Sequence, residues 1–310
     1  MRVTFLGNAP WSVPPLETLA GSSHGVRVVT RAPRPAGRGG RLRPTPVADA
    51  ARRLGLPVAE VETVRTGPGL DALVESPPDV LAVVAYGEIL PAEVLAIPRV
   101  VPVNLHFSLL PELRGAAPVQ RAILEGLTAT GVTTIRMDQG MDTGPILLQA
   151  EEHVRDDDDS GSLGARLAAI GGRLLVDTLD RLEAGTVVEH PQDDERATYA
   201  PKLTRDDEVI DWSESADRVV DRIRALSPEP GARTMFRGRV LKVRRAEWRS
   251  LGEPGGEPTG SLTMVEELPA AYAGSEGVVV LQEVQLEGKR SISGAEFVRG
   301  YRPAPEERLG

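Results

Sequence analysis

The first half of the chain alternates between short runs of branched apolar residues and segments with helical spacing. Short continuous apolar runs are typical of strands that are buried on both faces. The valine-rich runs occupy residues 3–6, 26–30, 80–85, 100–105 and 132–137. Helical stretches, several of which open with proline, lie between them at residues 14–19, 46–54, 69–74, 91–95 and 118–124. This alternation predicts the α/β class with right-handed crossovers and a doubly wound, mostly parallel, Rossmann-like sheet.

A long helix follows, and then the pattern changes. Residues 162–183 keep apolar side chains at helical spacing, and we expect Asp159 or Ser160 to cap the start of this helix and Gly185 its end. Proline and acidic residues then interrupt the periodicity. We therefore predict a first domain at residues 1–190, a linker at 191–209 and a second domain at 210–310.

The predicted second domain differs in kind from the first. A helix opens near Trp212, with Ser213 as its expected cap, and Pro228 stops it. Valine-rich runs separated by glycine- and proline-rich turns then occupy residues 240–243, 261–265, 278–284 and 289–292. Short strands with such turns predict a small antiparallel β-barrel.

Composition narrows the possible chemistry. The chain has no cysteine, which excludes disulfides, thiolate metal sites and a thiol nucleophile. Its four histidines are scattered without ligand spacing, so we expect no bound metal. No apolar run approaches the roughly 20 residues of a membrane helix, and the first run is too short for a signal peptide. We expect a soluble, cytoplasmic protein with no membrane partner, and a monomer, because nothing in the sequence demands assembly.

The net charge of −9 conceals two arginine clusters. Five arginines fall between residues 31 and 43 with no acid among them, and residues 233–249 hold a second basic group interrupted only by Glu247. Acids concentrate elsewhere, as at residues 156–159. Local clusters, rather than the net sum, make a nucleic-acid footprint. The alternative is a solvated arginine-rich surface without a partner.

Three polar side chains follow predicted strands. Asn104 and His106 stand at the end of the run 100–105, and Asp142 lies on a glycine-flanked loop after the run 132–137. Ligands bind at the carboxyl ends of parallel strands. There an amide can hold a developing oxyanion, an imidazole can accept a proton and a carboxylate can orient the imidazole. The three residues would therefore suit acyl transfer to an amine without a covalent intermediate.

The same residues admit simpler interpretations. An Asn-x-His pair at a strand end is more often structural than catalytic, and Asp142 can serve as a turn residue between glycines. Asp138 is a rival carboxylate four residues earlier. Ser108 lies near the pair, but no G-x-S-x-G motif surrounds it. The segment from Gly7 to Pro10 lacks the glycine fingerprint of a dinucleotide site.

Longer stretches that cover nearly the whole chain add to these single residues. The most specific are NLHFSLLP at residues 104–111 and RGAAPVQR at 114–121. The others are YGEILP at 86–91, MDTG at 141–144, RPAGRG at 34–39, YAPKL at 199–203, IDWS at 210–213, VQLEGK at 284–289 and FVRG at 297–300. Together these stretches resemble the methionyl-tRNA formyltransferases of the folate-dependent formyltransferase family.

The resemblance implies a formyl donor, 10-formyltetrahydrofolate, and an acceptor, the methionine amine on initiator tRNA. It implies a catalytic trio of Asn104, His106 and Asp142, and a second domain of OB-like fold that contacts tRNA. The implied folate-binding residues are Tyr86, Gly87, Ile89, Leu90, Ser108, Leu109, Leu110 and Pro111. The implied tRNA-binding residues are Arg34, Arg38, Arg41, Arg43, Arg237, Arg239, Lys242 and Arg244.

Some positions depart from the family pattern. Residues 31–33 read Arg-Ala-Pro where Gln-Pro-Asp is usual, residues 227–230 read Ser-Pro-Glu-Pro in place of Asn-Pro-Trp-Pro, and Asn8 and Ala9 replace Thr-Pro. A folate-dependent formyltransferase acting on an amino sugar nucleotide or other small amine is the nearest alternative, although it would not need the arginine clusters. A non-catalytic RNA-binding protein and a nucleotide-dependent oxidoreductase are further alternatives.

Overall fold

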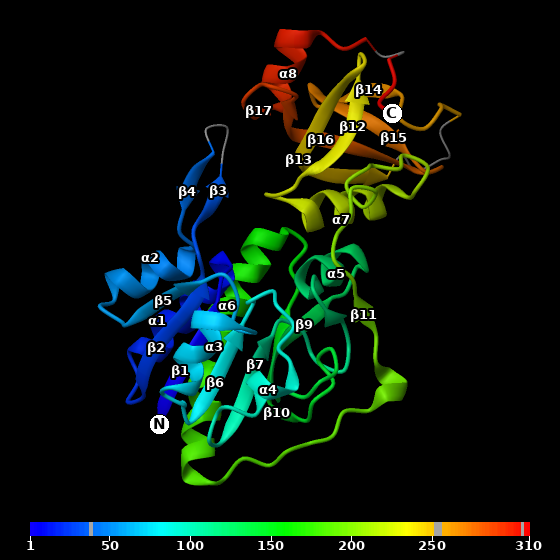
Figure 1. Ribbon diagram of the computed structural model, residues 1–310. Helices are drawn as coiled ribbons and strands as arrows, with labels where there is room; N and C mark the ends of the chain where they lie inside the picture. Colours follow the sequence, from blue (N-terminus) through cyan, green and yellow to red (C-terminus); the bar gives the residue numbers. More distant parts are fainter. Residues whose placement is uncertain (37–39, 251–255, 305–306) are drawn as a thin grey trace. The chain divides into compact units, whose positions relative to one another are not determined.

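The computed structural model describes residues 1–36, 40–250, 256–304 and 307–310 (Figure 1). The chain forms two compact units. The first comprises residues 1–118, 129–153 and 164–201, and the second comprises residues 119–128, 154–163 and 202–310. In the segment 191–209 the change from one unit to the other follows Pro201.

A seven-stranded sheet in the order β10-β9-β7-β6-β1-β2-β5 organises the first unit. Its parallel strands are β1 (Arg2–Gly7), β2 (Gly25–Arg31), β5 (Val58–Val61), β6 (Val80–Val84) and β7 (Val101–His106). Two strands, β9 (Ala129–Arg136) and β10 (Ile146–His153), are added antiparallel. The predicted α/β class with a mostly parallel sheet is confirmed. The strand order reverses between β1 and β6, which makes their carboxyl ends the switch point where ligands bind in such sheets.

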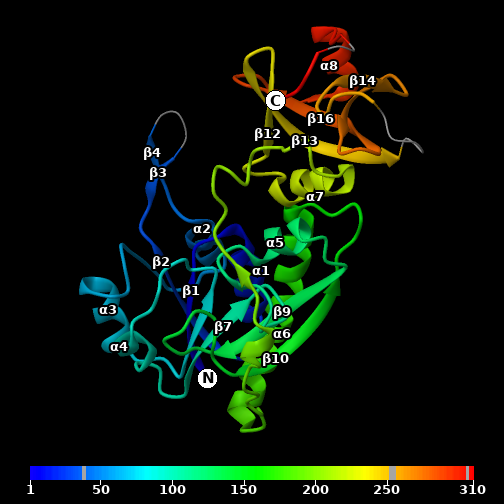
Figure 2. The same cartoon turned by 90° about the vertical axis from the view of Figure 1, so that its right-hand side faces the viewer.

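Helices cover both faces of this sheet. They are α1 (Val13–Ala20), α2 (Pro46–Arg53), α3 (Gly67–Val74), α4 (Ala92–Leu95) and α6 (Ser160–Ala184), with a 3-10 turn, η1, at Pro10–Ser12. The helix α5 (Pro118–Leu124) belongs, except for Pro118, to the second unit. Figure 2 shows α3 and α4 on one side of the sheet and α1 on the other. On the α3 and α4 face Leu6, Leu81 and Leu73 share one apolar cluster. No helix in the described parts of the chain combines the length and hydropathy needed to cross a membrane.

Three small elements complete the first unit. A hairpin is formed by β3 (Arg34–Ala36) and β4 (Arg41–Arg43). A two-residue strand, β8 (Arg114–Gly115), pairs in parallel with β11 (Tyr199–Ala200), and the 3-10 turn η2 occupies Asp194–Arg196. The strand β10 is missed by the sequence pattern because half-buried and exposed positions alternate along most of it, whereas the parallel strands are continuously apolar.

The second unit is built on an antiparallel sheet. Pairing runs through β12 (Ala232–Phe236), β13 (Arg239–Ser250), β16 (Gly277–Leu286), β15 (Leu268–Ala273) and β14 (Leu262–Val265), with β17 (Ile292–Ser293) on β16. The predicted antiparallel character is confirmed. Within the described residues β12 and β14 do not pair, so the closed barrel that the pattern predicts is not among the strand pairings.

The helix α7 (Ala216–Leu226) lies against this sheet, and α8 (Gly294–Tyr301) follows β17. Trp212, Val219 and Phe236 belong to one buried cluster. The expected cap Ser213 is wrong, because α7 begins after Ser215 and the Ser213 hydroxyl donates to Asp211 Oδ1 at 2.6 Å. The expected cap of α6 is confirmed for Asp159, whose Oδ1 accepts from the Ser162 amide at 2.8 Å.

Candidate active site

The three polar side chains singled out in the sequence meet at the carboxyl end of β7. The side-chain amide of Asn104 donates through Nδ2 to Asp142 Oδ1 at 3.1 Å. His106 Nδ1 lies 3.6 Å from Asp142 Oδ2. The side chains of His106 and Asp142 are only 6% and 16% exposed, so their electrostatic interaction is weakly screened by water.

The imidazole of His106 has a defined orientation. Its Nε2 is 2.9 Å from the main-chain carbonyl oxygen of Leu113. A carbonyl oxygen only accepts, so Nε2 carries a hydrogen and Nδ1 is the nitrogen that is free to take up a proton. Because Nδ1 faces Asp142, protonation of the ring creates an ion pair with the carboxylate.

The Asp142 carboxylate is itself held on both oxygens. While Oδ1 accepts from Asn104, Oδ2 accepts from the Gly115 amide at 2.9 Å. Asp142 has a φ of +56°, in the left-handed region that non-glycine residues rarely adopt. The rival Asp138 has a different surrounding: its Oδ1 accepts from the Gly140 amide at 3.0 Å and from the Thr143 hydroxyl at 2.8 Å. The structure therefore brings Asp142, and not Asp138, to the Asn104–His106 pair.

Two residues that sequence reasoning missed support the Asp142 loop. Gln192 Nε2 donates to the main-chain oxygens of Asp142 and Gly144, at 2.7 Å each. Gln192 Oε1 in turn accepts from Arg114 Nε at 3.1 Å and from its terminal nitrogen at 2.8 Å. Gln192 lies in the segment predicted to be a linker, where nothing in the hydropathy pattern marks it.

The residues expected to bind folate lie on the loops that follow β6 and β7. Gly87 and Ile89 are exposed, Leu109 is half-buried and the other five are buried. Side chains from neighbouring strands hydrogen-bond to main-chain groups of these loops. The Leu110 amide donates to Thr133 Oγ1 at 3.1 Å, and the Gly87 oxygen accepts from the Arg31 side chain at 3.0 Å. The two loops therefore form a fixed main-chain edge beside the switch point.

Tyr86 is the one strongly perturbed titratable group on these loops. Burial, with the neighbouring Glu88 carboxylate, raises the pKa of the Tyr86 hydroxyl, while the Arg31 guanidinium opposes the shift. The phenol therefore keeps its proton at neutral pH and does not serve as a base there. Its contribution to this edge is an apolar ring, which packs in the same cluster as Leu6 and Leu90.

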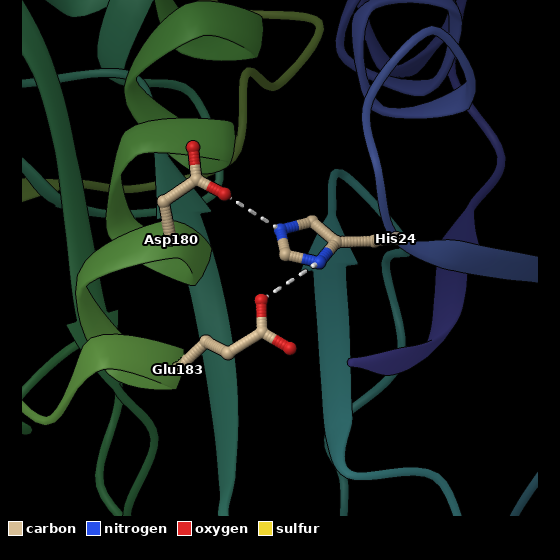
Figure 3. A group of neighbouring side chains, drawn as sticks. All are labelled: His24, Asp180 and Glu183. Atoms are coloured by element: carbon tan, nitrogen blue, oxygen red, sulfur yellow. Dashed lines mark ion pairs between the residues drawn. The ribbon is translucent and has the colours of Figure 1, made fainter.

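A single group in the described parts of the chain has the composition of a metal site (Figure 3). His24 Nε2 lies 3.2 Å from Asp180 Oδ1, and its Nδ1 lies 3.9 Å from Glu183 Oε2. The amino group of Met1 already stands there, 3.1 Å from His24 Nδ1 and 2.9 Å from Glu183 Oε1. An ammonium in this place supplies the positive charge that a metal would bring. The expectation of a metal-free protein stays a prediction.

The predicted tRNA-binding residues divide into two groups. Arg34, Arg41 and Arg43 are exposed on the β3–β4 hairpin, whereas Arg38 lies outside the described residues. All four of the second unit have partners within the chain. Arg237 pairs with Glu307 at 2.5 Å, Arg239 donates to the Glu287 carbonyl at 2.8 Å, Lys242 donates to the Pro230 carbonyl at 2.6 Å, and Arg244 donates to Gln285 Oε1 at 2.7 Å.

Comparisons with known proteins identify the family of the chain. Residues 1–179 match the formyl transferase family, and residues 202–302 match the formyl transferase C-terminal domain. A methionyl-tRNA formyltransferase of Roseiflexus castenholzii is 45% identical over 100% of this chain and 99% of its own length. That of Solibacter usitatus is 40% identical, again over 100% of this chain and 99% of the relative.

Solved structures share the fold at lower identity. An N-formyltransferase of Helicobacter canadensis, in complex with folinic acid and dTDP-3-aminofucose, has a TM-score of 0.67 at 17% identity and covers 90% of this chain and 98% of its own. HypX of Aquifex aeolicus with tetrahydrofolic acid has a TM-score of 0.63 at 17% identity, covering 97% of this chain and 48% of its own. The resemblance found in the sequence is confirmed, and the chain belongs to the formyl transferase family, among the methionyl-tRNA formyltransferases.

Proposed function

We propose that this protein transfers a formyl group from 10-formyltetrahydrofolate to the methionine amine of initiator Met-tRNA, as a cytoplasmic monomer. Full-length relatives named methionyl-tRNA formyltransferase, with 40% and 45% identity to this chain, support the proposal. The observation that carries the chemistry is the meeting of Asn104, His106 and Asp142 at one strand end. Solved structures titled as sugar formyltransferases, or in complex with an amino sugar nucleotide, are only 15–22% identical to this chain, which favours the tRNA substrate over an amino sugar.

The trio suits direct attack of an amine on the formyl carbon. As the new carbon–nitrogen bond forms, the formyl oxygen becomes an oxyanion. One hydrogen of the Asn104 amide is used by Asp142, and the second, which has no acceptor among the described residues, can be donated to this oxygen. An oxyanion donor of this kind typically stabilises the transition state by about 3 kcal/mol.

His106 and Asp142 take part in the transfer of the proton that the attacking amine releases. The attacking nitrogen must lose a proton, and Nδ1 of His106 is oriented to accept it. Asp142 then stabilises the imidazolium at 3.6 Å. The same proton passes to the folate nitrogen when its bond to the formyl carbon breaks, so the reaction leaves tetrahydrofolate and the formylated amine with no other reactant.

The folate lies along the main-chain edge formed by residues 86–90 and 108–111 in this proposal. A flat pterin pairs with main-chain donors and acceptors, and it needs an apolar wall more than charged side chains. The buried Leu90 and Leu110 supply apolar surface in these loops. Pairing of Leu110 with Thr133 keeps the second loop in place before the co-substrate arrives.

The β3–β4 hairpin is suited to a polyanion. In its register Arg34 lies directly opposite Arg43. Like charges in this position destabilise a strand pair, and a two-stranded ribbon is marginal by itself. No ion pair within the described residues joins Arg34, Arg41 or Arg43 to a carboxylate. A phosphate of the tRNA between these arginines would relieve the repulsion, and Arg38 would extend the contact.

The second unit would contribute further positive charge. Arg239 and Lys242 donate to main-chain carbonyls, which are neutral, so both side chains keep their charge for a phosphate. Arg244 donates to the neutral Gln285 and to the Pro228 carbonyl, and its carboxylate partner among the described residues is the exposed Glu229, at 3.5 Å. Arg237 is different because Glu307 already neutralises it. We expect Arg237 to contribute least to tRNA binding among these four.

Transfer of labelled formyl groups tests the proposal. The wild-type protein and 10-formyltetrahydrofolate are offered charged Met-tRNA, uncharged tRNA and an amino sugar nucleotide in parallel. Label is expected on Met-tRNA alone. Faster labelling of the amino sugar than of Met-tRNA would refute the proposed acceptor.

A further inference from the structure

The segment after α6, residues 190–200, runs past the Asp142 loop and is held by main-chain hydrogen bonds at both ends. We call it the strap; Figure 1 shows it between the end of α6 and β11. At its start His190 exchanges two main-chain hydrogen bonds with Ile146, at 2.8 and 2.9 Å. At its end the Ala200 oxygen accepts from the amides of Ala116 and Ala117, at 2.9 and 3.1 Å. The strap therefore occupies a fixed path beside the proposed catalytic trio.

Gln192 is the side chain of the strap that reaches the Asp142 loop. Both hydrogens of its amide are used, one by the Asp142 carbonyl and one by the Gly144 carbonyl, at 2.7 Å each. Its oxygen accepts twice from Arg114. The oxygen and both hydrogens of the Gln192 amide are thus hydrogen-bonded, and a flip of the amide would break all of these hydrogen bonds.

Arg114 fixes the orientation of this amide through its two hydrogen bonds to Gln192 Oε1. It is 3% exposed, and besides Gln192 it pairs with Asp194 at 2.8 Å, whose side chain is 84% exposed. A buried guanidinium is costly unless hydrogen bonds satisfy it. Its planar set of donors holds Gln192 Oε1 in one place, which leaves Gln192 Nε2 directed at the loop.

The loop needs such support. Asp142 adopts a left-handed backbone conformation, which is unfavourable for a residue with a side chain and persists only where surrounding contacts impose it. The contacts from Gln192 are to the main chain on both sides of Thr143, whereas the contacts of Asn104 and Gly115 are to the carboxylate. Gln192 therefore controls where the carboxylate stands without touching it.

We propose that Gln192, oriented by Arg114, is a positioning residue that holds Asp142 in reach of Asn104 and His106. The inference rests on the proposed formyl transfer. A shift of about 1 Å in a catalytic group can reduce the rate a hundredfold. Loss of Gln192 should therefore lower kcat while leaving the binding of both substrates unchanged.

The test uses Gln192→Glu in the full-length protein. A glutamate keeps the attachment to Arg114 but has no hydrogens for the two carbonyls, and its charge repels them. We expect kcat for Met-tRNA formylation to fall about 10- to 100-fold, with the KM for each substrate within about twofold of the wild type. Asp194→Asn is the matched control, because it changes the charge of the other strap residue that contacts Arg114 and leaves Gln192 in place; its kcat should change less than about threefold.

A double-mutant cycle separates positioning from general damage to the fold. If Gln192 acts through Asp142, then Asp142→Asn combined with Gln192→Glu should be no slower than Asp142→Asn alone. Additive losses, or a kcat within twofold of the wild type in Gln192→Glu, would overturn the inference. If Gln192→Glu fails to fold, Arg114→Lys replaces it, because lysine keeps the positive charge but lacks the paired donors of the guanidinium. Its loss of kcat should likewise be non-additive with that of Asp142→Asn, and additive losses would overturn the inference. A wild-type protein that does not formylate Met-tRNA would instead refute the proposed function.

Discussion

Replacing Asp142 by asparagine removes the charge of this side chain and leaves its shape. Both carboxylate oxygens accept hydrogen bonds in the wild type, one from Asn104 and one from the Gly115 amide. Asparagine has one acceptor and one donor group, so either orientation places two donors against each other. The substitution also removes the negative charge that faces His106 Nδ1 at 3.6 Å.

The loss of charge sets the expected magnitude. Unit charges separated by 3.6 Å attract by about 1 kcal/mol in bulk water and by about 5 kcal/mol at an effective dielectric constant of about 20. Because the two side chains are only 6% and 16% exposed, the upper part of this range applies. Each 1.4 kcal/mol is about tenfold in rate. We therefore expect kcat to fall at least about a hundredfold.

Single-turnover transfer of labelled formyl groups to Met-tRNA measures this loss without a contribution from product release. The parallel variant is Asp138→Asn, which alters the other carboxylate of the same segment and leaves the trio intact. We expect its rate within about fivefold of the wild type. A rate for Asp142→Asn within threefold of the wild type, or a larger loss in Asp138→Asn, would refute the electrostatic role assigned to Asp142.

Three further outcomes follow from the geometry. A Cβ at Gly171 on α6 would stand 2.8 Å from a buried leucine of β7, so Gly171→Ala should lower the free energy of unfolding by about 1–3 kcal/mol, measured by urea denaturation. Arg43→Glu converts the repulsive pair with Arg34 into an attractive one, so the hairpin should be kept while the affinity for tRNA and its salt dependence decrease, measured by titration at several salt concentrations. Hydrogen bonding from Arg237 lowers the pKa of Glu307 below its unfolded value near 4.5, so the stabilisation is present above that pH and is lost as the pH falls through the folded-state pKa. Arg237→Gln should therefore destabilise the protein at pH 7, and its effect should decrease as the pH falls through the folded-state pKa.

The sequence predicts the parallel part of the fold well because those strands are continuously apolar. It does not reveal that β9 runs antiparallel, since a strand buried on both faces looks the same in either direction. Nor does it find β10, whose exposed face is polar. Capping of α7 is misplaced by two residues because Ser213 and Ser215 are equivalent as sequence signals.

Only some residues of the candidate site, too, could be predicted from the sequence. Asn104 and His106 are predictable because they end β7 at the carboxyl edge of the sheet. Asp142 is expected beside them from the rule for parallel strands, but β9 runs antiparallel to β7, and it is the loop after β9 that brings Asp142 to Asn104. Gln192 and Arg114 are not predictable, because their contacts with the Asp142 loop depend on how a segment without periodicity crosses the sheet. The internal partners of Arg237 and Lys242 are equally hidden, since a basic residue looks the same in sequence whether a phosphate, a carboxylate or a carbonyl will receive it.

The strap also sets an order of assembly. During synthesis β7, which carries Asn104 and His106, and the loop that carries Asp142 leave the ribosome before residues 190–200 do. The early chain can therefore form most of the sheet and bring the three side chains together, but the hydrogen bonds from Gln192 to the Asp142 loop form only after the strap has been synthesised. Maturation of the site would then lag behind formation of the sheet, so that a nascent chain stalled before the strap would be folded over much of its first unit and still short of full activity.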